Sequence, residues 1–381
     1  MTNKGELARQ PNDNRMAWIR NIESLTSDKK GSYVVECEFL SEARISSVLS
    51  YADGMIQCGG LEFEKDENGL YRYLLRLEHA GIKDPSYNKF ADKDGYYFKD
   101  GILGELLAIF SLFFQARFYP IATYMGELTP TSLPSRHGVH LRYQKPILGN
   151  YPEIFDKNKT RRFSELQGFL DMIRGIPPQS HHVVIRAIDH YARALREIGV
   201  DTEMVFIRLV SSIEALSGDF AIPTEQNPLH GANYAIFDDV ELSDRQRKQL
   251  REMLKVDKTG SITVDKSKKK FLGFLDTYSV GCLRGGNRKA KHCKIYRKDV
   301  PKYLRSIYDA RSCYLHDGLS MYISEQYAAA YNWDVDPGLG MTIDNHQFSG
   351  SSKLPHPSWF ENMVRHALMK YMNALASGTG L

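Results

Sequence analysis

Hydrophobic and polar residues alternate in the first part of the chain, and this two-residue period is typical of a β-strand with one buried face. Residues 35–39 have the sequence Val-Glu-Cys-Glu-Phe, which places three apolar side chains on one face and two carboxylates on the other. Residues 61–63 and 71–73 flank the turn-rich sequence Asp-Glu-Asn-Gly at 66–69, an arrangement typical of a β-hairpin. We therefore predict a small α+β N-terminal domain over residues 1–98.

In the rest of the chain, apolar residues recur at the spacing of amphipathic helices. Residues 101–118 contain the longest apolar stretch, which is too short to span a bilayer and follows the charged Glu105, so it predicts a buried helix. Residues 182–198 and 360–375 each carry an apolar stripe. We predict a helical domain over residues 99–381 and a mainly α fold class for the protein.

Residues that favour helix ends indicate where several of these helices start or stop. Asp201 can cap the helix that follows it, and residues 243–246 form a capping-box pattern. A later helix is expected to begin with Asp299 as its N-cap and Pro301 in its first turn, and to stop at Gly318. Its apolar residues are Leu304, Ile307, Tyr308 and Leu315.

The composition, with 42% hydrophobic and 25% charged residues, is that of an ordinary globular protein. The five cysteines are scattered, odd in number and unpatterned, so we expect free thiols in a reducing compartment. The sequence contains no secretory signal and no apolar segment long enough to span a membrane. These features predict a cytoplasmic protein without a membrane partner.

The positive charge is concentrated in one segment. Residues 265–305 contain nine lysines, four arginines and three aspartates, a net charge of +10, while the whole chain has +4 and the remainder therefore −6. Such asymmetry is expected of a surface that binds nucleic acid, and Tyr296 could stack on a base. The alternative is a solvated loop without a partner. The candidate RNA-binding residues are Arg288, Lys289, Lys291, Lys294, Arg297 and Lys298.

The end of the helix predicted before Gly318 contains a candidate catalytic motif. Residues 307–318 have the sequence Ile-Tyr-Asp-Ala-Arg-Ser-Cys-Tyr-Leu-His-Asp-Gly, with four residues between Arg311 and His316. This resembles the Arg-x4-6-His signature of the HEPN superfamily. The aromatic residue at 308, the Arg-Ser pair that includes Ser312 and the His-x-Gly ending resemble the Apea-like subgroup, although an Asp separates His and Gly here.

A second segment extends this resemblance. Residues 206–216 contain Glu214 and are similar to the Glu-containing helix that precedes the motif helix in the Apea-like subgroup. The resemblance covers roughly residues 100–375. It implies a HEPN-like helical bundle, dimeric assembly, and Arg311 and His316 as the catalytic pair. Glu214 could hold Arg311 in a charge-assisted ion pair, with Ser312 as a further supporting residue.

The residue types in the motif suit metal-free RNA cleavage. Imidazole can accept or donate a proton near neutral pH, and a guanidinium can stabilise charge on phosphate oxygens. Five positions along a helix separate two side chains by ~140° around the axis, so Arg311 and His316 do not stack on each other. They can converge if the helix frays at His316 or if two copies meet across a dimer.

Other catalytic and cofactor motifs do not occur in the sequence. It contains no Gly-rich phosphate loop, no Gly-x-Ser-x-Gly and no paired-carboxylate metal motif. The spacing of Cys282, His292 and Cys293 matches no usual zinc pattern. We therefore expect neither a cofactor nor a metal.

These observations predict a metal-independent endoribonuclease whose partners are RNA and a second copy of the chain. The resemblance implies a bacterial defence or growth-arrest effector, in which residues 1–98 would respond to a trigger or inhibitor. The first alternative is a non-catalytic HEPN-like RNA-binding or assembly module. The second is a structural subunit with no RNA role. For the motif residues themselves the alternative is structural, with Arg311 bonded to a carboxylate and His316 favoured by the helix dipole.

Overall fold

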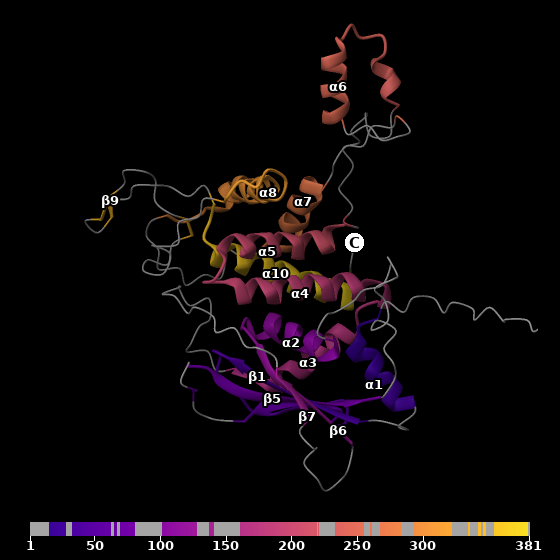
Figure 1. The fold of residues 1–381 in the computed structure, drawn as a ribbon, viewed down its shortest axis with the longest axis vertical. Coiled ribbons are helices and arrows are strands. Elements are labelled where there is room, and N and C mark those ends of the chain that lie inside the picture. Colours follow the sequence, from indigo (N-terminus) through magenta and orange to yellow (C-terminus); the bar gives the residue numbers. More distant parts are fainter. Residues whose placement is uncertain are drawn as a thin grey trace, which may run out of the picture.

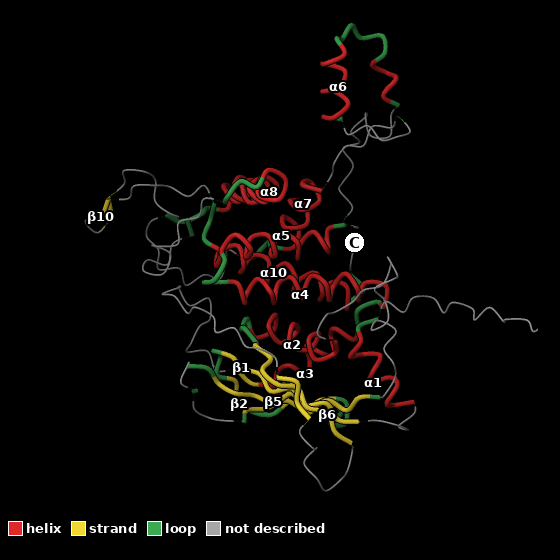
Figure 2. Tube along the Cα trace, in the orientation of Figure 1, coloured by secondary structure: helices red, strands yellow, loops and turns green. Residues whose placement is uncertain are grey.

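The computed structural model of the protein consists of an antiparallel sheet at one end and stacked helices above it (Figures 1 and 2). All structural statements below refer to the residues that it describes. These are residues 15–27, 33–61, 65–66, 69–80, 101–127, 137–140, 161–218, 220, 233–254, 260, 267–282, 293–321, 334–335, 342–343, 346–347 and 354–379.

The sheet contains six strands in the order β3-β4-β5-β1-β6-β7, and each neighbouring pair is antiparallel. The strands are β1 (Tyr33–Ser41), β3 (Leu49–Tyr51), β4 (Ile56–Gly60), β5 (Tyr71–His79), β6 (Tyr119–Glu127) and β7 (His137–His140). The predicted strand at 35–39 is confirmed as part of β1. The predicted hairpin is confirmed in part: β4 pairs with β5, and Asp66 Oδ1 accepts a hydrogen bond from the Leu70 amide at 2.8 Å. The first strand of this hairpin ends at Gly60, before the predicted residues 61–63, of which residues 62 and 63 lie outside the described part of the chain.

The sheet does not end at residue 98. The strands β6 and β7 follow that position, and β6 pairs with β1 along the edge that β5 leaves free. This finding corrects the expectation that the chain is helical from residue 99 onward. A pairing between residues 33–41 and 119–127 leaves no local signal in the sequence, because the paired residues lie 79 to 94 positions apart.

Two additional strand pairs are short. β2 (Ile45–Ser46) pairs in parallel with β8 (Arg161–Arg162), and β9 (Thr342–Ile343) pairs with β10 (His346–Gln347). The first of these pairs connects the sheet region to the chain segment that enters the helices.

The described helices other than α6 are stacked in layers above the sheet (Figure 1). The described helices are α1 (Ala17–Ser27), α2 (Gly101–Phe114), α3 (Leu166–Arg174), α4 (His181–Glu197), α5 (Thr202–Ser217), α6 (Asp244–Met253), α7 (Ser267–Tyr278), α8 (Val300–Asp317) and α10 (Pro357–Ala376). Next to the sheet are α1, α2 and α3; α4, α5 and α10 form the middle; α7 and α8 form the far side. The predicted mainly helical class is confirmed.

Most predicted helix ends are confirmed. The Asp201 carboxylate accepts a hydrogen bond from the Met204 amide at 2.9 Å, and Ser243 and Gln246 exchange the hydrogen bonds of a capping box. Asp299 occupies the N-cap position of α8, but its side chain makes no capping hydrogen bond, so that part of the prediction is wrong. Instead, a short 3-10 turn at Arg297–Asp299 precedes α8, and its Arg297 carbonyl accepts a hydrogen bond from the Val300 amide at the start of the helix.

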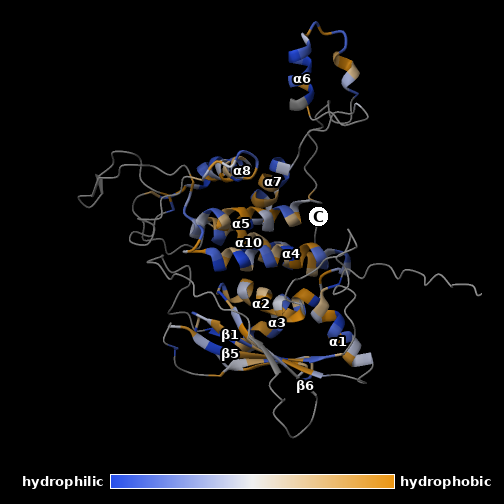
Figure 3. Ribbon diagram, viewed as in Figure 1, coloured by the Kyte–Doolittle hydropathy of each residue, from blue (hydrophilic) through white to orange (hydrophobic). Residues whose placement is uncertain are grey.

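One hydrophobic core joins the sheet to the helices. Phe39 of β1 packs against Phe118 with ring centroids 5.4 Å apart, and Phe118 packs in turn against Phe110 of α2 at 6.2 Å. A single cluster of buried residues continues from Met16 to Met372. Figure 3 shows α2 as mainly hydrophobic and α6 as mainly hydrophilic, which matches the burial of α2 inside this core.

A buried polar network crosses the middle layer. Glu361 of α10 is fully buried, and its two carboxylate oxygens accept hydrogen bonds from Tyr191 of α4 and Gln115. Burial raises the pKa of the Glu361 carboxyl above its ordinary value. This network fixes α10 against α4, because a buried carboxylate must keep its donors in place.

Within the described part of the chain, no helix combines the length and apolar character that crossing a bilayer requires. All five cysteines are free thiols, and Cys313 is exposed.

Candidate functional site

The motif helix α8 lies on the outer side of the bundle. Leu304 and Ile307 are its two buried residues, and they pack the first half of the helix against α5 and α7. Gly318 ends the helix in the left-handed region, at φ +67°, and its amide donates to the Cys313 carbonyl. The second half of α8, which contains the motif, therefore has no buried residue.

The predicted contact between Arg311 and Glu214 is confirmed. Arg311 Nη2 lies 2.7 Å from Glu214 Oε2, and the two side chains are 19% and 26% exposed. The Tyr308 hydroxyl donates to the other carboxylate oxygen, Oε1, at 3.0 Å. Glu214 of α5 thus receives two donors from one face of α8, and it fixes the direction of the Arg311 guanidinium.

Arg311 keeps unused hydrogen-bonding capacity. Its contact with Glu214 is its one hydrogen bond to the described residues, although a guanidinium carries five N–H donors. The Nε atom is buried without an acceptor among these residues. The guanidinium can therefore donate to a further group, such as a phosphate oxygen, without giving up Glu214.

His316 is exposed in the last turn of α8. The helix continues through His316 to Asp317, so the convergence by fraying that the sequence left open does not occur in this structure. At ~140° around the helix axis, His316 and Arg311 face different directions. Arg311 and His316 make no hydrogen bond to each other in this structure, and their convergence across two copies stays a prediction. Ser312 is half-buried and makes no side-chain hydrogen bond to a described residue.

Two apolar side chains close to His316 in the sequence are exposed. Leu315 is 48% exposed and Leu319 is 59% exposed. This corrects the prediction that Leu315 belongs to the buried face of the helix. The chain after Gly318 is held in place by Glu203 of α5, which accepts from the Met321 amide at 2.6 Å and from the Ser320 hydroxyl.

Three predicted RNA-binding residues of the basic segment lie just before α8. The predicted RNA-binding residues Lys294, Arg297 and Lys298 are exposed and make no ion pair with described residues. Arg288, Lys289 and Lys291 lie outside the described residues. Lys268, in the same charged segment, is neutralised by an ion pair with Asp309 of α8.

Backbone contacts position the start of this basic loop. The Ile295 amide donates to Asp334 Oδ2 at 2.9 Å, and the Asp334 amide donates to the Cys293 carbonyl at 3.2 Å. Ile295 is buried, whereas the side chains on either side of it point outward. The loop therefore presents Lys294 and Tyr296 from a fixed backbone.

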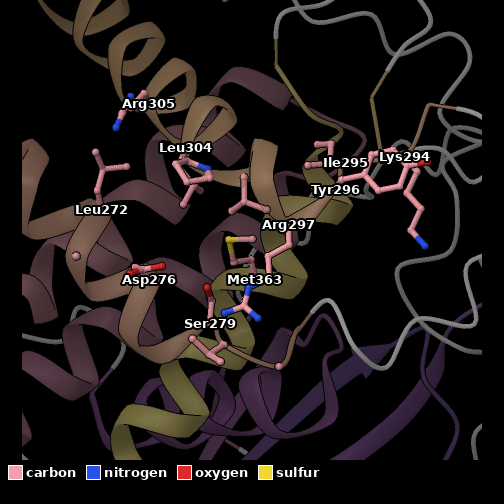
Figure 4. A pocket seen from close by; sticks show the side chains of 15 residues that line it. Leu272, Asp276, Ser279, Lys294, Ile295, Tyr296, Arg297, Leu304, Arg305 and Met363 are labelled. Atoms are coloured by element: carbon pink, nitrogen blue, oxygen red, sulfur yellow. The ribbon is translucent and has the colours of Figure 1, made fainter.

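A pocket of about 560 Å³ lies where this loop meets α7, the start of α8 and α10 (Figure 4). Its basic residues include Arg305 of α8, and its one carboxylate is that of Asp276 of α7. The sequence indicates Lys294 and Arg297 as candidate binding residues, but it does not indicate these two. Their contribution was not visible in the sequence because they come from helices whose packing brings them to the loop.

Metal ligands are not grouped in the described residues. No set of three or more His, Cys, Asp or Glu side chains there has the arrangement that would hold a metal ion. Cys282 donates to the Asn362 carbonyl, and His292, which the sequence analysis had weighed with Cys282 and Cys293, lies outside the described residues.

The fold and this surface define a mainly helical protein with a small N-terminal antiparallel sheet and an arginine–glutamate pair beside an exposed histidine. No protein-family model, no curated protein and no solved structure matches the chain.

Proposed function

We propose that the protein is a metal-independent endoribonuclease of the HEPN type, with Arg311 and His316 as its catalytic residues. The observation that carries the proposal is the free end of α8, where Glu214 orients Arg311 and His316 stays accessible. An arginine with unused donors and an exposed imidazole are the two groups that metal-free phosphodiester cleavage needs.

The proposed reaction is an internal displacement at phosphorus. The 2′-oxygen of the RNA forms a bond to the adjacent phosphorus atom, and the bond from that phosphorus to the 5′-oxygen of the next nucleotide breaks. A neutral His316 accepts the 2′-hydroxyl proton, and a protonated His316 from the second copy gives a proton to the leaving 5′-oxygen. Arg311 donates hydrogen bonds to the non-bridging oxygens, where negative charge grows. The products carry a 2′,3′-cyclic phosphate and a 5′-hydroxyl.

The two-copy site follows from the orientation of the side chains. Because Arg311 and His316 point in different directions on one helix, two helix ends must meet to surround a single phosphate. The exposed Leu315 and Leu319 supply apolar area beside His316 for such a contact. Burying them in a dimer would remove from water the apolar side chains that a single chain leaves uncovered.

The basic segment provides a path for the RNA strand. Lys294, Arg297 and Lys298 lie directly before α8 and have no ion-pair partner among the described residues, so they can neutralise phosphates. Residues 1–98 would act as the part that responds to a trigger or inhibitor. Their shared core with the helices gives such a response a continuous physical route to α8.

The test is RNA cleavage by the full chain and by two variants, Arg311→Ala and His316→Ala. Each variant should lose cleavage by at least a hundredfold, because one removes charge stabilisation and the other removes proton transfer. Cleavage by the unaltered protein should continue in EDTA and leave 2′,3′-cyclic phosphate ends. Both readouts come from gel analysis of an end-labelled RNA.

Lys302→Ala serves as a matched control, because Lys302 is an exposed cation on α8 outside the motif. It should keep near-normal cleavage. A folded His316→Ala variant that cleaves RNA normally would remove His316 from the mechanism, and a strict Mg²⁺ requirement would place the chemistry at another site.

A non-catalytic RNA-binding module is the second candidate, and the Tyr308–Glu214–Arg311 network favours it, since the same network can serve to hold α8 on α5. In that case the unaltered protein binds RNA without cleaving it, and Arg311→Ala lowers stability with little effect on RNA affinity. Measuring binding and cleavage on the same RNA separates the two candidates.

A further inference from the structure

The pocket between α7, α8 and α10 has the composition of a ligand site. Three basic residues line it, Lys294, Arg297 and Arg305, against a single carboxylate, that of Asp276. None of these four side chains makes a hydrogen bond or ion pair with the described residues. Basic side chains that line a concave place and have no partner among the described residues can pair with a bound anion.

The pocket also has an apolar interior. Its walls include Leu272, Val300 and Leu304, and Met363 of α10 closes it at the back. In Figure 4 the guanidinium of Arg297 projects into the space towards the wall formed by Ser279, while Lys294 extends away from it. Apolar walls with a few polar groups directed inward are typical of sites for small organic ligands, and about 560 Å³ is within their usual range.

An aromatic ring stands at the rim. Tyr296 lines the pocket and is 61% exposed, although a tyrosine ring is a large apolar group that is usually at least partly buried. Its backbone is fixed, because the neighbouring Ile295 is buried and bonded to Asp334. A fixed and exposed ring beside arginines is the arrangement on which nucleic-acid bases stack.

We propose that this pocket binds a nucleoside phosphate, with Arg297 and Arg305 on the phosphate and Tyr296 stacked on the base. The tyrosine ring would stack on the base and the cations would bind the phosphate. The apolar walls would contact the sugar. Asp276 can accept hydrogen bonds from the amino group of a base. The ligand is either a free nucleotide or one nucleotide unit of an RNA strand. The site is distinct from Arg311 and His316, and its occupation does not require cleavage.

The experiment measures binding to the full chain by calorimetry at low salt. The probes are the four nucleoside 5′-monophosphates and an eight-nucleotide RNA with 2′-O-methyl groups, which the proposed cleavage reaction cannot cut. Arg297→Gln and Arg305→Gln should each weaken binding by about tenfold, because each removes a charge-assisted hydrogen bond. Val280→Trp, at an exposed position on the pocket wall, should block it by filling the space.

Lys302→Gln is the matched control, since it removes one positive charge from α8 outside the pocket and should leave binding within twofold. Binding of a monophosphate that follows this pattern identifies a free-nucleotide site. If the RNA probe alone binds and follows the same pattern, the ligand is a unit of the strand. Absence of binding by every probe at millimolar concentration overturns the proposal, and so does binding that the pocket variants leave unchanged. Because no probe can be cleaved, failure of the ribonuclease proposal would not alter any of these results.

Discussion

At the scale of single residues, Glu214 is the centre of the candidate site. Its carboxylate accepts from Tyr308 and from Arg311, so both oxygens are used by residues three positions apart on α8. The pair with Arg311 is about three-quarters removed from water, where a charge-assisted hydrogen bond contributes more than it does at the surface. Glu214 touches no substrate in the proposed reaction, and it acts as a positioning residue for Arg311.

Glu214→Gln should reduce cleavage mainly through kcat, because Arg311 loses its fixed direction while RNA binding by the basic segment is preserved. Stability should fall by about 1–3 kcal/mol, the cost of leaving a partly buried charge without its counterpart. Steady-state cleavage and urea unfolding measure the two effects. Tyr308→Phe is the control, since it removes one hydroxyl and keeps the ion pair. Equal losses in both variants would show that the pair has no positioning role.

At the scale of helices, α10 is held in place through the hydrogen bonds of a buried carboxyl group, that of Glu361. Glu361 is fully buried, and burial raises the pKa of its carboxyl above the ordinary 4.5. At pH values between the ordinary pKa of the unfolded state and the raised pKa of the folded state, the folded state binds more protons than the unfolded state. Glu361 therefore lowers the stability of the fold as the pH rises through this range. The hydrogen bonds from Tyr191 and Gln115 oppose this loss, because they stabilise the charged form.

Tyr191→Phe should therefore destabilise the protein by about 1–3 kcal/mol, since the buried carboxylate loses a donor. The loss should be larger at pH 7.5 than at pH 5, where more of the carboxyl is protonated and needs the donor less. Urea unfolding at the two pH values measures it. Tyr278→Phe provides the comparison, because Tyr278 is also buried and its hydroxyl has no hydrogen bond to the described residues. An equal loss at both pH values would be inconsistent with this role for Tyr191.

At the scale of the whole molecule, the end of α8 carries exposed apolar side chains. Leu315 and Leu319 expose about half of their side chains or more beside His316. The sheet lies at the opposite end of the stack from α7 and α8 (Figure 1), so two copies could meet through α8 without involving the sheet. A two-fold contact at this place would put two motif helices end to end.

Adding an equal amount of inactive His316→Ala chain should lower wild-type cleavage to about half after subunits exchange, because mixed dimers lack one proton-transfer group. The same chain with Leu315→Glu and Leu319→Glu should remain monomeric in light scattering and have no inhibitory effect. Leu61→Glu, at an exposed leucine beside the sheet, is the control for a charge introduced elsewhere. Full cleavage by a monomer would place a complete site within one chain.

The sequence alone determined the local features of this protein. The capping of α5 by Asp201, the capping box at Ser243, the stop of α8 at Gly318 and the stripe of α10 were all predicted. They were predictable because helix ends and helix faces depend on residues within a few positions of each other. The placement of Arg311 and His316 on one helix follows from the same rule.

The tertiary structure decided what depends on distant segments. Pairing of β6 with β1 carried the sheet past residue 98, because strand pairing satisfies backbone groups from any part of the chain. The packing of α5 on α8 brought Glu214 to Arg311 across 97 positions, an ion pair that the sequence could suggest but not establish. The exposure of Leu315 and the gathering of Asp276 and Arg305 around one pocket likewise followed from which helices are neighbours. A pattern within one helix shows which side chains share a face, and only the packing of the other helices determines what that face meets.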